Sequence, residues 1–332
     1  YRRKWITLLF TKKFEKYVDT EIVSQTLCLW KEWLLKMSNI NDYISWRGDV
    51  IIDSDNSFNE IDSMILARSS YLIFNRIEMN EKETIKSISE KMKDFENEEF
   101  RYNGDKEMIT KLGLSKRFQN MQITDFVEIN DKEVEKQFGA ITIHISDEEM
   151  YISYIGTDST IYGWKEDFNM SFMDYVPCQS EGKNYLERIA HKYPNKKIRI
   201  GGHSKGGNVA IYSAIMTTQE IQDRIIKVYN YDGPGFNRKI VERFQNHPIL
   251  NKIETYFPQS SVIGRIMEHK EKCRIVKSNE KGIYQHDIFS WEVIGNDLVQ
   301  VESLTETSET INKTLTDWLE NTTVDERKAF LD

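Results

Sequence analysis

The stretch KIRIGGHSKGGNVA, residues 197–210, decides the fold of this chain. Its first four residues alternate between polar and apolar and predict a short β-strand. After the turn, residues 207–216 form an apolar, alanine-containing run that predicts a helix. A serine between strand and helix, Ser204, flanked by Gly202 and Gly206, is typical of a sharp turn that presents a nucleophilic side chain. Such a turn strains the backbone of its serine, so small residues are needed on both sides.

Strands and helices alternate on either side of this turn. Residues 181–193 form an amphipathic helical pattern that ends at a proline, and residues 225–231 read as a strand. Further short strands are predicted at residues 253–257 and 274–276. This alternation predicts an α/β protein with a mostly parallel central sheet and helices on both faces. With the strand–serine–helix turn, the class is the α/β-hydrolase fold.

A hairpin is predicted directly before this region. Residues 141–145 alternate apolar and polar side chains, residues 146–149 are turn-forming, and residues 150–155 read as a second strand. Residues 138–332 therefore carry the catalytic sheet.

The preceding part, residues 37–137, is predicted to be largely helical. Residues 59–74 roughly keep helical spacing, and residues 81–99 are highly charged with one apolar face, as expected of a surface helix. Residues 104–127 read as helix and turn. We expect residues 37–332 to form a single α/β-hydrolase domain.

Composition excludes several classes of function. The net charge of −8 argues against a nucleic-acid partner, which would need a basic surface. The three cysteines, Cys28, Cys178 and Cys273, are far apart and form no metal-binding motif, a pattern that fits a reducing compartment. No apolar stretch approaches the roughly 18 residues that a transmembrane helix needs. We expect a cytoplasmic protein without metal or organic cofactor.

Residues 1–36 differ from the rest and have two interpretations. They are rich in basic and bulky apolar residues and contain no methionine, the first being Met37. One interpretation is a basic amphipathic helix that associates weakly with a membrane surface or a partner. The other is an extension upstream of a natural start at Met37, so that residues 1–36 are not native.

A serine nucleophile needs a base that removes its proton. In α/β-hydrolases the chain order is serine, then acid, then histidine, so the base lies downstream of Ser204. His247 lies in a loop and His269 in a charged run, so both read as solvated surface residues. His286 lies in a polar break after the last predicted strand, where a loop would return to the nucleophile. His286 is the predicted base; a hydrogen-bonded structural role is its alternative.

The oxyanion of the reaction needs two backbone N–H donors. The residue after the nucleophile, Lys205, supplies one by position, and the loop after an earlier strand supplies the other. Thr157, which follows Gly156 at the end of the predicted hairpin, is the natural second donor, although an ordinary glycine turn is equally compatible. The side chain of His203 is expected to leave the turn in a different direction from Ser204.

Several segments resemble known families in the same order along the chain. Gly156-Thr157, then Trp164-x-x-Asp167, then the turn at residues 202–206 resemble the class 3 (fungal-type) lipases. An uncharacterised bacterial family of lipase-like α/β-hydrolases is a closer resemblance. It rests on Asn41-Asp42-Tyr43, Trp46-Arg47-Gly48-Asp49, Gly156-Thr157-Asp158, residues 163–168, residues 201–210, residues 231–236, Gln285-His286-Asp287 and Ser290-Trp291. Members begin near the equivalent of Met37 and tend to continue beyond residues 327–330, so the resemblance implies that the chain is cut short.

The acid of the site departs from this resemblance. In class 3 lipases an aspartate opens the segment that corresponds to residues 260–264, where this chain has serine. Asp232, just after the strand that follows the turn, is the predicted acid; a role in capping its own glycine-rich turn is as compatible. Asp287 is expected to point away from His286, and Asp158 and Asp167 precede the nucleophile.

The predicted function is hydrolysis of carboxylic esters, by resemblance lipid-like ones, with a small-molecule ester or lipid as the partner. Peptide or thioester cleavage would use the same groups. The alternative, motivated by the serine at position 261, is a catalytically weak or inactive scaffold that binds a ligand or partner.

Overall fold

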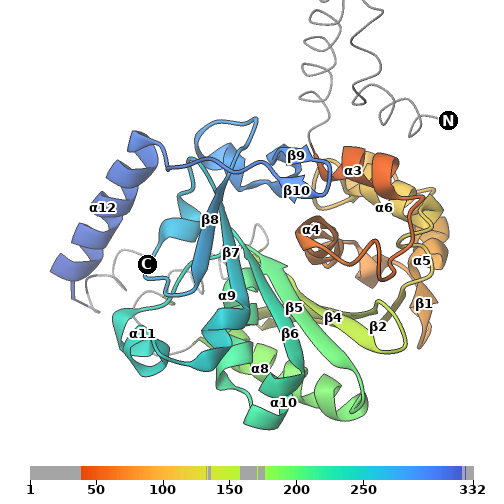
Figure 1. Ribbon diagram of the computed structural model, residues 1–332, viewed down its shortest axis with the longest axis horizontal. Helices are drawn as coiled ribbons and strands as arrows, with labels where there is room; N and C mark the ends of the chain where they lie inside the picture. Colours follow the sequence, from red (N-terminus) through yellow and green to blue (C-terminus); the bar gives the residue numbers. More distant parts are fainter. Residues whose placement is uncertain are drawn as a thin grey trace, which may run out of the picture.

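The computed structural model describes residues 39–131, 133, 136–157, 170, 176–323 and 326. Its centre is an eight-stranded sheet whose spatial order follows the chain (Figure 1). The strands are β1 Glu83–Thr84, β2 Gln122–Asp131, β3 Lys136–His144, β4 Glu149–Tyr154, β5 Lys197–His203, β6 Ile225–Tyr231, β7 Ile253–Pro258 and β8 Lys272–Val276. A separate antiparallel pair consists of β9 Val293–Ile294 and β10 Asp297–Leu298.

The pairing of neighbouring strands changes from antiparallel to parallel at β4. Strands β1 to β4 pair antiparallel, which confirms the predicted β3–β4 hairpin, and strands β4 to β8 pair parallel. Helices follow β4, β5 and β6, because a parallel neighbour requires a crossover connection. The carboxyl ends of β4 to β8 therefore lie along one edge of the sheet, where α/β proteins place their functional loops.

Helices cover both faces of the sheet (Figure 1). The α-helices are α3 Ile40–Arg47, α4 Glu60–Ser69, α5 Ile85–Met92, α6 Asp105–Leu114, α8 Pro177–Lys192, α9 Lys205–Met216, α10 Gln219–Arg224, α11 Arg238–Phe244 and α12 Glu306–Asn321. Short 3₁₀ helices are η1 Phe74–Arg76, η2 Asn97–Glu99, η3 Pro248–Lys252, η4 Ile263–Arg265, η5 Gly282–His286 and η6 Ile288–Ser290. The predicted α/β-hydrolase architecture is confirmed.

Two hydrophobic cores follow from the alternation of side chains along the strands. Ile141, Ile143 and Tyr151 face the layer formed by α3 to α6, and all three are fully buried. Ala140 and Ile152 point to the other face, where they pack with residues of α8 to α11. Since neighbouring residues of a strand point to opposite faces, β3 and β4 contribute to both cores at once.

A buried ion pair connects the N-terminal helices. Arg117 donates from Nε to Oδ1 of Asp62 at 2.7 Å, and a second bond joins its Nη2 to the other carboxylate oxygen. Both side chains are completely buried. Arg117 also donates to the carbonyls of Val50, Asn56 and Ser57, so one guanidinium holds the loop between α3 and α4.

The interpretation of residues 104–127 as helix and turn is correct for α6 and the turn at residues 116–120, but it is wrong from Gln122 onward. Residues from Gln122 onward form β2, whose register shifts between Thr124 and Val127. Asp125 lies in this bulge with φ 56°. A bulge inserts an extra residue and breaks the period of two, so the strand does not show simple alternation in the sequence.

The predicted surface helix at residues 81–99 is shorter than expected. Only Ile85–Met92 is α-helical, and the Thr84 hydroxyl caps its start by accepting from the Ser87 N–H. The predicted apolar face is nevertheless confirmed, since Ile85, Ile88 and Met92 of this helix are buried. The extension at residues 1–36 and its proposed surface association lie outside the described residues. Among the described helices, none is long and apolar enough to span a membrane.

Candidate active site

Ser204 is the only residue between β5 and α9. Its backbone has φ 57° and ψ −135°, a conformation that residues other than glycine rarely adopt. The Ser204 N–H donates to the carbonyl of Tyr231 at 2.9 Å, and the Ser204 carbonyl accepts from the Gly207 N–H at 2.9 Å. The turn thus has the strained form that the sequence predicts for a nucleophile at its apex.

Close packing explains the glycines of the turn. A Cβ atom on Gly206 would lie 2.3 Å from the carbonyl oxygen of Tyr154 on β4. A Cβ atom on Gly202 would lie 2.3 Å from the carbonyl carbon of Gly206. Neither contact is sterically possible, so only glycine lets α9 begin this close to the strand.

His286 and Asp232 come together at the same edge of the sheet. Nδ1 of His286 lies 2.7 Å from Oδ2 of Asp232, and the aspartate is 1% exposed, whereas 24% of the histidine side chain is exposed. Asp232 directly follows β6, and its N–H donates to the carbonyl of Tyr256 on β7 at 2.8 Å. This bond fixes the carboxylate where the loop that contains η5 brings in His286.

Ser261 occupies the other oxygen of the carboxylate. Its hydroxyl donates to Oδ1 of Asp232, and the serine is 1% exposed. Ser261 follows β7, at the place where the resemblance led us to expect the acid. Because Ser261 donates to Asp232, the two residues share one site: the strand before supplies the carboxylate, and the serine satisfies its second oxygen.

The two predicted oxyanion donors lie on segments that meet at Ser204. Lys205 is the first residue of α9, so its N–H lies at the helix N-terminus, where the helix dipole places partial positive charge. Residues 155–157, which we call the oxyanion loop after the predicted role of Thr157, follow β4. A Cβ atom on Gly156 would lie 3.2 Å from Cβ of Ser204, which puts this loop against the predicted nucleophile. Thr157, the next residue, is half-buried.

The side chain of Lys205 has a different environment from its backbone. It is 1% exposed, and its ammonium group donates to the carbonyl and side-chain oxygens of Gln137 at 3.2 and 3.3 Å. These bonds direct the side chain to β3, so its charge is compensated by hydrogen bonds beneath the turn.

His203 contacts both neighbouring loops through its ring. Nε2 lies 2.7 Å from the carbonyl oxygen of His286, and Nδ1 lies 3.2 Å from the hydroxyl of Tyr71. The two histidine rings lie 4.5 Å apart, centroid to centroid. Complete burial, together with the nearby His286 and Arg68, holds the pKa of His203 well below its usual value. His203 is therefore neutral at physiological pH.

Tyr71 was not identified from the sequence. It follows α4 and is 2% exposed, and its hydroxyl accepts from the Gly156 N–H at 3.0 Å. The hydroxyl also lies 3.2 Å from the carbonyl oxygen of His203. No local signal marks this tyrosine, because its partners are 85 and 132 positions away in the chain.

The interpretation of His269 as a solvated residue is wrong. Its side chain is 5% exposed and lies between the Glu271 carboxylate, 2.7 Å from Nδ1, and the Gly264 carbonyl, 2.8 Å from Nε2. His269, Glu271 and Cys273 place possible metal-ligand atoms within 4.8 Å of one another. Both ring nitrogens of His269 are already hydrogen-bonded, so metal binding there would have to break one of these bonds. His247 caps η3 by accepting from the Ile249 N–H.

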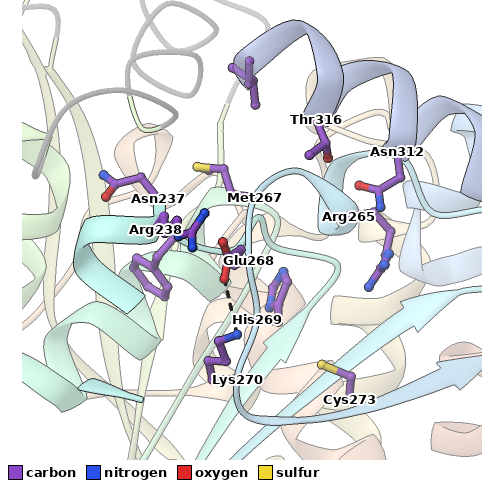
Figure 2. A pocket seen from close by; sticks show the side chains of 12 residues that line it. Asn237, Arg238, Arg265, Met267, Glu268, His269, Lys270, Cys273, Asn312 and Thr316 are labelled. Atoms are coloured by element: carbon purple, nitrogen blue, oxygen red, sulfur yellow. Dashed lines mark ion pairs between the residues drawn. The ribbon is translucent and has the colours of Figure 1, made fainter. Parts of the chain in front are cut away.

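A cavity of about 530 Å³ lies beside α12 (Figure 2). Arg265, His269 and Cys273 line it from the segment around the start of β8, and Asn312 and Thr316 line it from α12. The predicted nucleophile, acid and base are not among its lining residues, so this cavity is not the place for an acyl group bound at the turn.

The remaining predicted carboxylates differ in position. Asp287 follows His286, and its Oδ1 accepts from the Phe289 N–H at 3.1 Å, so it caps η6. Asp158 and Asp167, with Trp164, lie outside the described residues.

Comparison with solved structures finds fungal lipases. The chain is similar to the enzyme of a fungal lipase–inhibitor complex, with 14% identity and a TM-score of 0.39 over 58% of this chain and 76% of the other. It is also similar to the Lip2 lipase of Yarrowia lipolytica, with 11% identity and a TM-score of 0.37 over 59% and 74%. It is also similar to a mutant form of MDLA from Penicillium cyclopium, with 11% identity and a TM-score of 0.42 over 78% of this chain and 92% of the other.

Comparison by sequence gives the family. No protein of curated function matches the chain. The profile of the Mbeg1-like family matches residues 112–332, more than half of the sequence, and this span contains Ser204, Asp232 and His286. The chain therefore belongs to the Mbeg1-like family.

Proposed function

We propose that this protein is a serine hydrolase that cleaves carboxylic esters through an acyl-enzyme on Ser204. The observation that carries the proposal is the 2.7 Å contact between His286 and the buried Asp232 at the edge of the sheet where Ser204 takes its strained conformation. In such a site the serine is the nucleophile, the histidine is the base and the carboxylate orients the histidine.

The first half of the reaction forms the acyl-enzyme. Since Nδ1 of His286 is bonded to Asp232, Nε2 is the ring nitrogen that takes the proton of the Ser204 hydroxyl. The serine oxygen attacks the ester carbonyl carbon, and the Asp232 carboxylate stabilises the imidazolium that forms. Collapse of the tetrahedral intermediate breaks the bond to the alcohol, which leaves with the proton from His286.

The intermediate carries its negative charge on the former carbonyl oxygen. The N–H groups of Lys205 and Thr157 donate to this oxygen, and the N-terminus of α9 adds favourable partial charge. In the second half His286 takes a proton from water, which attacks the acyl carbon. The acid leaves, and the proton returns to Ser204. No redox partner is needed for either half.

Lipid-like esters are the substrate class to test first. The support is the sequence resemblance to class 3 lipases around residues 156–157 and 202–206. The cavity beside α12 is not lined by Ser204 and carries no information on acyl-chain length, which experiment must determine.

Labelling with a fluorophosphonate probe tests the proposal directly. We expect the wild type to be labelled and Ser204→Ala to show no labelling, because the probe reacts only with an activated serine. Ser213→Ala, which changes a buried serine within α9, the helix that follows Ser204, is the matched control and keeps full labelling. A panel of p-nitrophenyl esters from acetate to palmitate then measures kcat/KM for increasing chain length.

Absence of labelling in well-folded wild-type protein would contradict the proposal. It would favour the alternative, a hydrolase-like scaffold that binds a ligand without turnover. Labelling that survives in Ser204→Ala would place the reactive serine elsewhere.

A further inference from the structure

His203 is a buried titratable residue that the proposed reaction does not use. Its ring contacts the backbone of the base, through the His286 carbonyl, and the hydroxyl of Tyr71. That hydroxyl in turn accepts from the N–H of Gly156 in the oxyanion loop. One imidazole and one phenol thus connect the two loops that flank Ser204.

Hydrogen-bond chemistry fixes the proton positions in this chain of contacts. A backbone carbonyl only accepts, so Nε2 of His203 must carry the hydrogen that points to His286. In a neutral ring Nδ1 is then an acceptor, and the single hydrogen of the Tyr71 hydroxyl has two acceptors on His203, the carbonyl oxygen and Nδ1, each at 3.2 Å. The oxygen of the same hydroxyl receives the Gly156 N–H, so each group has a compatible partner.

A neutral His203 suits the base beside it. The rings of His203 and His286 lie 4.5 Å apart, so a charge on the first would oppose transfer of a proton to the second. Burial keeps the first ring uncharged.

The consequence for geometry is that His286 is held at two places. Its Nδ1 is bonded to Asp232 and its carbonyl to His203, so both the ring and the backbone of the base have a fixed partner. Gly156, on the other side of Ser204, has its N–H turned to Tyr71. That bond orients the peptide that precedes Thr157.

We propose that Tyr71 and His203 are positioning residues that hold the oxyanion loop and His286 in fixed positions on the two sides of Ser204. This inference rests on the proposed hydrolase function. Both act through hydrogen bonds to the backbone of the segments that flank Ser204. Tyr71 is well placed for such a role because its ring is packed against Tyr102 at 5.5 Å between centroids and lies under the Arg68 guanidinium.

Three variants separate positioning from general stability. Tyr71→Phe removes only the hydroxyl, and His203→Asn removes the donor at the Nε2 position. His203→Gln places an amide N–H near that position and is the conservative rescue. Tyr151→Phe is the matched control, since it removes another buried hydroxyl, bonded to Ser63, from the same face of the sheet.

With p-nitrophenyl butyrate as substrate, we expect Tyr71→Phe and His203→Asn to lower kcat by about 10- to 100-fold, the range found for groups that orient a reactive residue. KM should change less than about threefold, because substrate contacts remain. His203→Gln should recover most of kcat, and Tyr151→Phe should keep it. A kcat for Tyr71→Phe equal to that of Tyr151→Phe would overturn the proposal.

Two measurements need no turnover and so distinguish this proposal from the hydrolase function. In the wild type, ¹⁵N correlation spectra of the histidines should show His203 neutral with its proton on Nε2. A proton on Nδ1 would overturn the proposed positioning role of His203. Hydrogen exchange at the Gly156 N–H should accelerate more than about tenfold in Tyr71→Phe but not in Tyr151→Phe. Unchanged exchange in Tyr71→Phe would overturn it as well, whatever the fluorophosphonate result.

Discussion

Nδ1 of His286 lies 2.7 Å from Oδ2 of Asp232, although the two residues are 54 positions apart in the chain. Asp232 directly follows β6 and His286 ends η5, so the contact depends on the register of neighbouring strands and on a long connection. This pair gives the proposed base one fixed tautomer, and the first prediction tests it.

Replacing Asp232 by asparagine should lower kcat by about 10³- to 10⁴-fold, because an amide neither stabilises the imidazolium nor enforces the tautomer. Asp287→Asn is the control, since this carboxylate neighbours His286 in the chain and caps η6 through an oxygen that an amide retains. Steady-state kinetics with p-nitrophenyl butyrate measure both variants, with circular dichroism as the check on folding. Retention of more than a tenth of wild-type kcat in Asp232→Asn would assign the acid elsewhere.

Replacing Gly206 by alanine should destabilise the protein by about 2–3 kcal/mol, as forced overpacking does. The new Cβ would lie 2.3 Å from the Tyr154 carbonyl oxygen, so α9 would have to move away from β4. Urea unfolding measures the loss, and fluorophosphonate labelling should disappear with it. Gly295→Ala meets no atom within 4 Å and strains only its backbone at φ 58°, so about 1 kcal/mol is expected there. Equal losses in the two variants would refute the steric explanation.

Replacing Arg117 by alanine should cost about 3–5 kcal/mol, because the fully buried Asp62 carboxylate would lose its charged partner. Its neighbour Lys116 forms an exposed ion pair with Asp49 at 3.8 Å, so Lys116→Ala should cost less than about 0.5 kcal/mol. Urea unfolding monitored by tryptophan fluorescence compares the two. A small loss for Arg117→Ala would show that the N-terminal helices are held mainly by apolar packing.

His144 should make the fold sensitive to acid. Burial lowers the pKa of His144 from its usual 6.5 to about 4, with the neighbouring Lys196 as the next cause. Between these values the unfolded chain binds a proton that the folded chain does not, so the free energy of unfolding falls as pH falls from about 6.5 to 4. Above pH 6.5 this contribution is fully present.

The variant His144→Gln should lose this part of the pH dependence. Relative to its stability at pH 8, we expect it to fall by about 2 kcal/mol less than the wild type on going to pH 4.5, after allowance for the partial exposure of the ring. Urea unfolding at pH 4.5, 5.5, 6.5 and 8 measures the difference. Parallel curves for the two proteins would mean that the pKa of His144 is not lowered.

Features with a local cause could be predicted from the sequence. The β3–β4 hairpin follows from alternation over a few residues, and the turn at Ser204 follows from glycines directly beside it. The strand β2 could not be predicted in this way, because the bulge at Asp125 breaks the alternation on which such predictions depend.

The candidate site was harder to predict, because its contacts join residues that are far apart in the chain. The sequence suggested His286 by its place after the last strand, and it offered Asp232 among several carboxylates. The charged run around His269 suggested a surface, yet Glu271 and Gly264 enclose that ring. Burial depends on what packs above a segment, and a charge pattern within the segment does not contain that information.

The sequence by itself determined the class of fold and the position of the strained serine, because period, glycine spacing and turn chemistry act between near neighbours. Only the tertiary structure decided that Asp232 lies beside His286, that Ser261 donates to the same carboxylate, and that Tyr71 reaches Gly156. These contacts arise where the ends of separate strands and a distant helix meet. Their geometry is set by strand register and layer packing, which are properties of the whole chain.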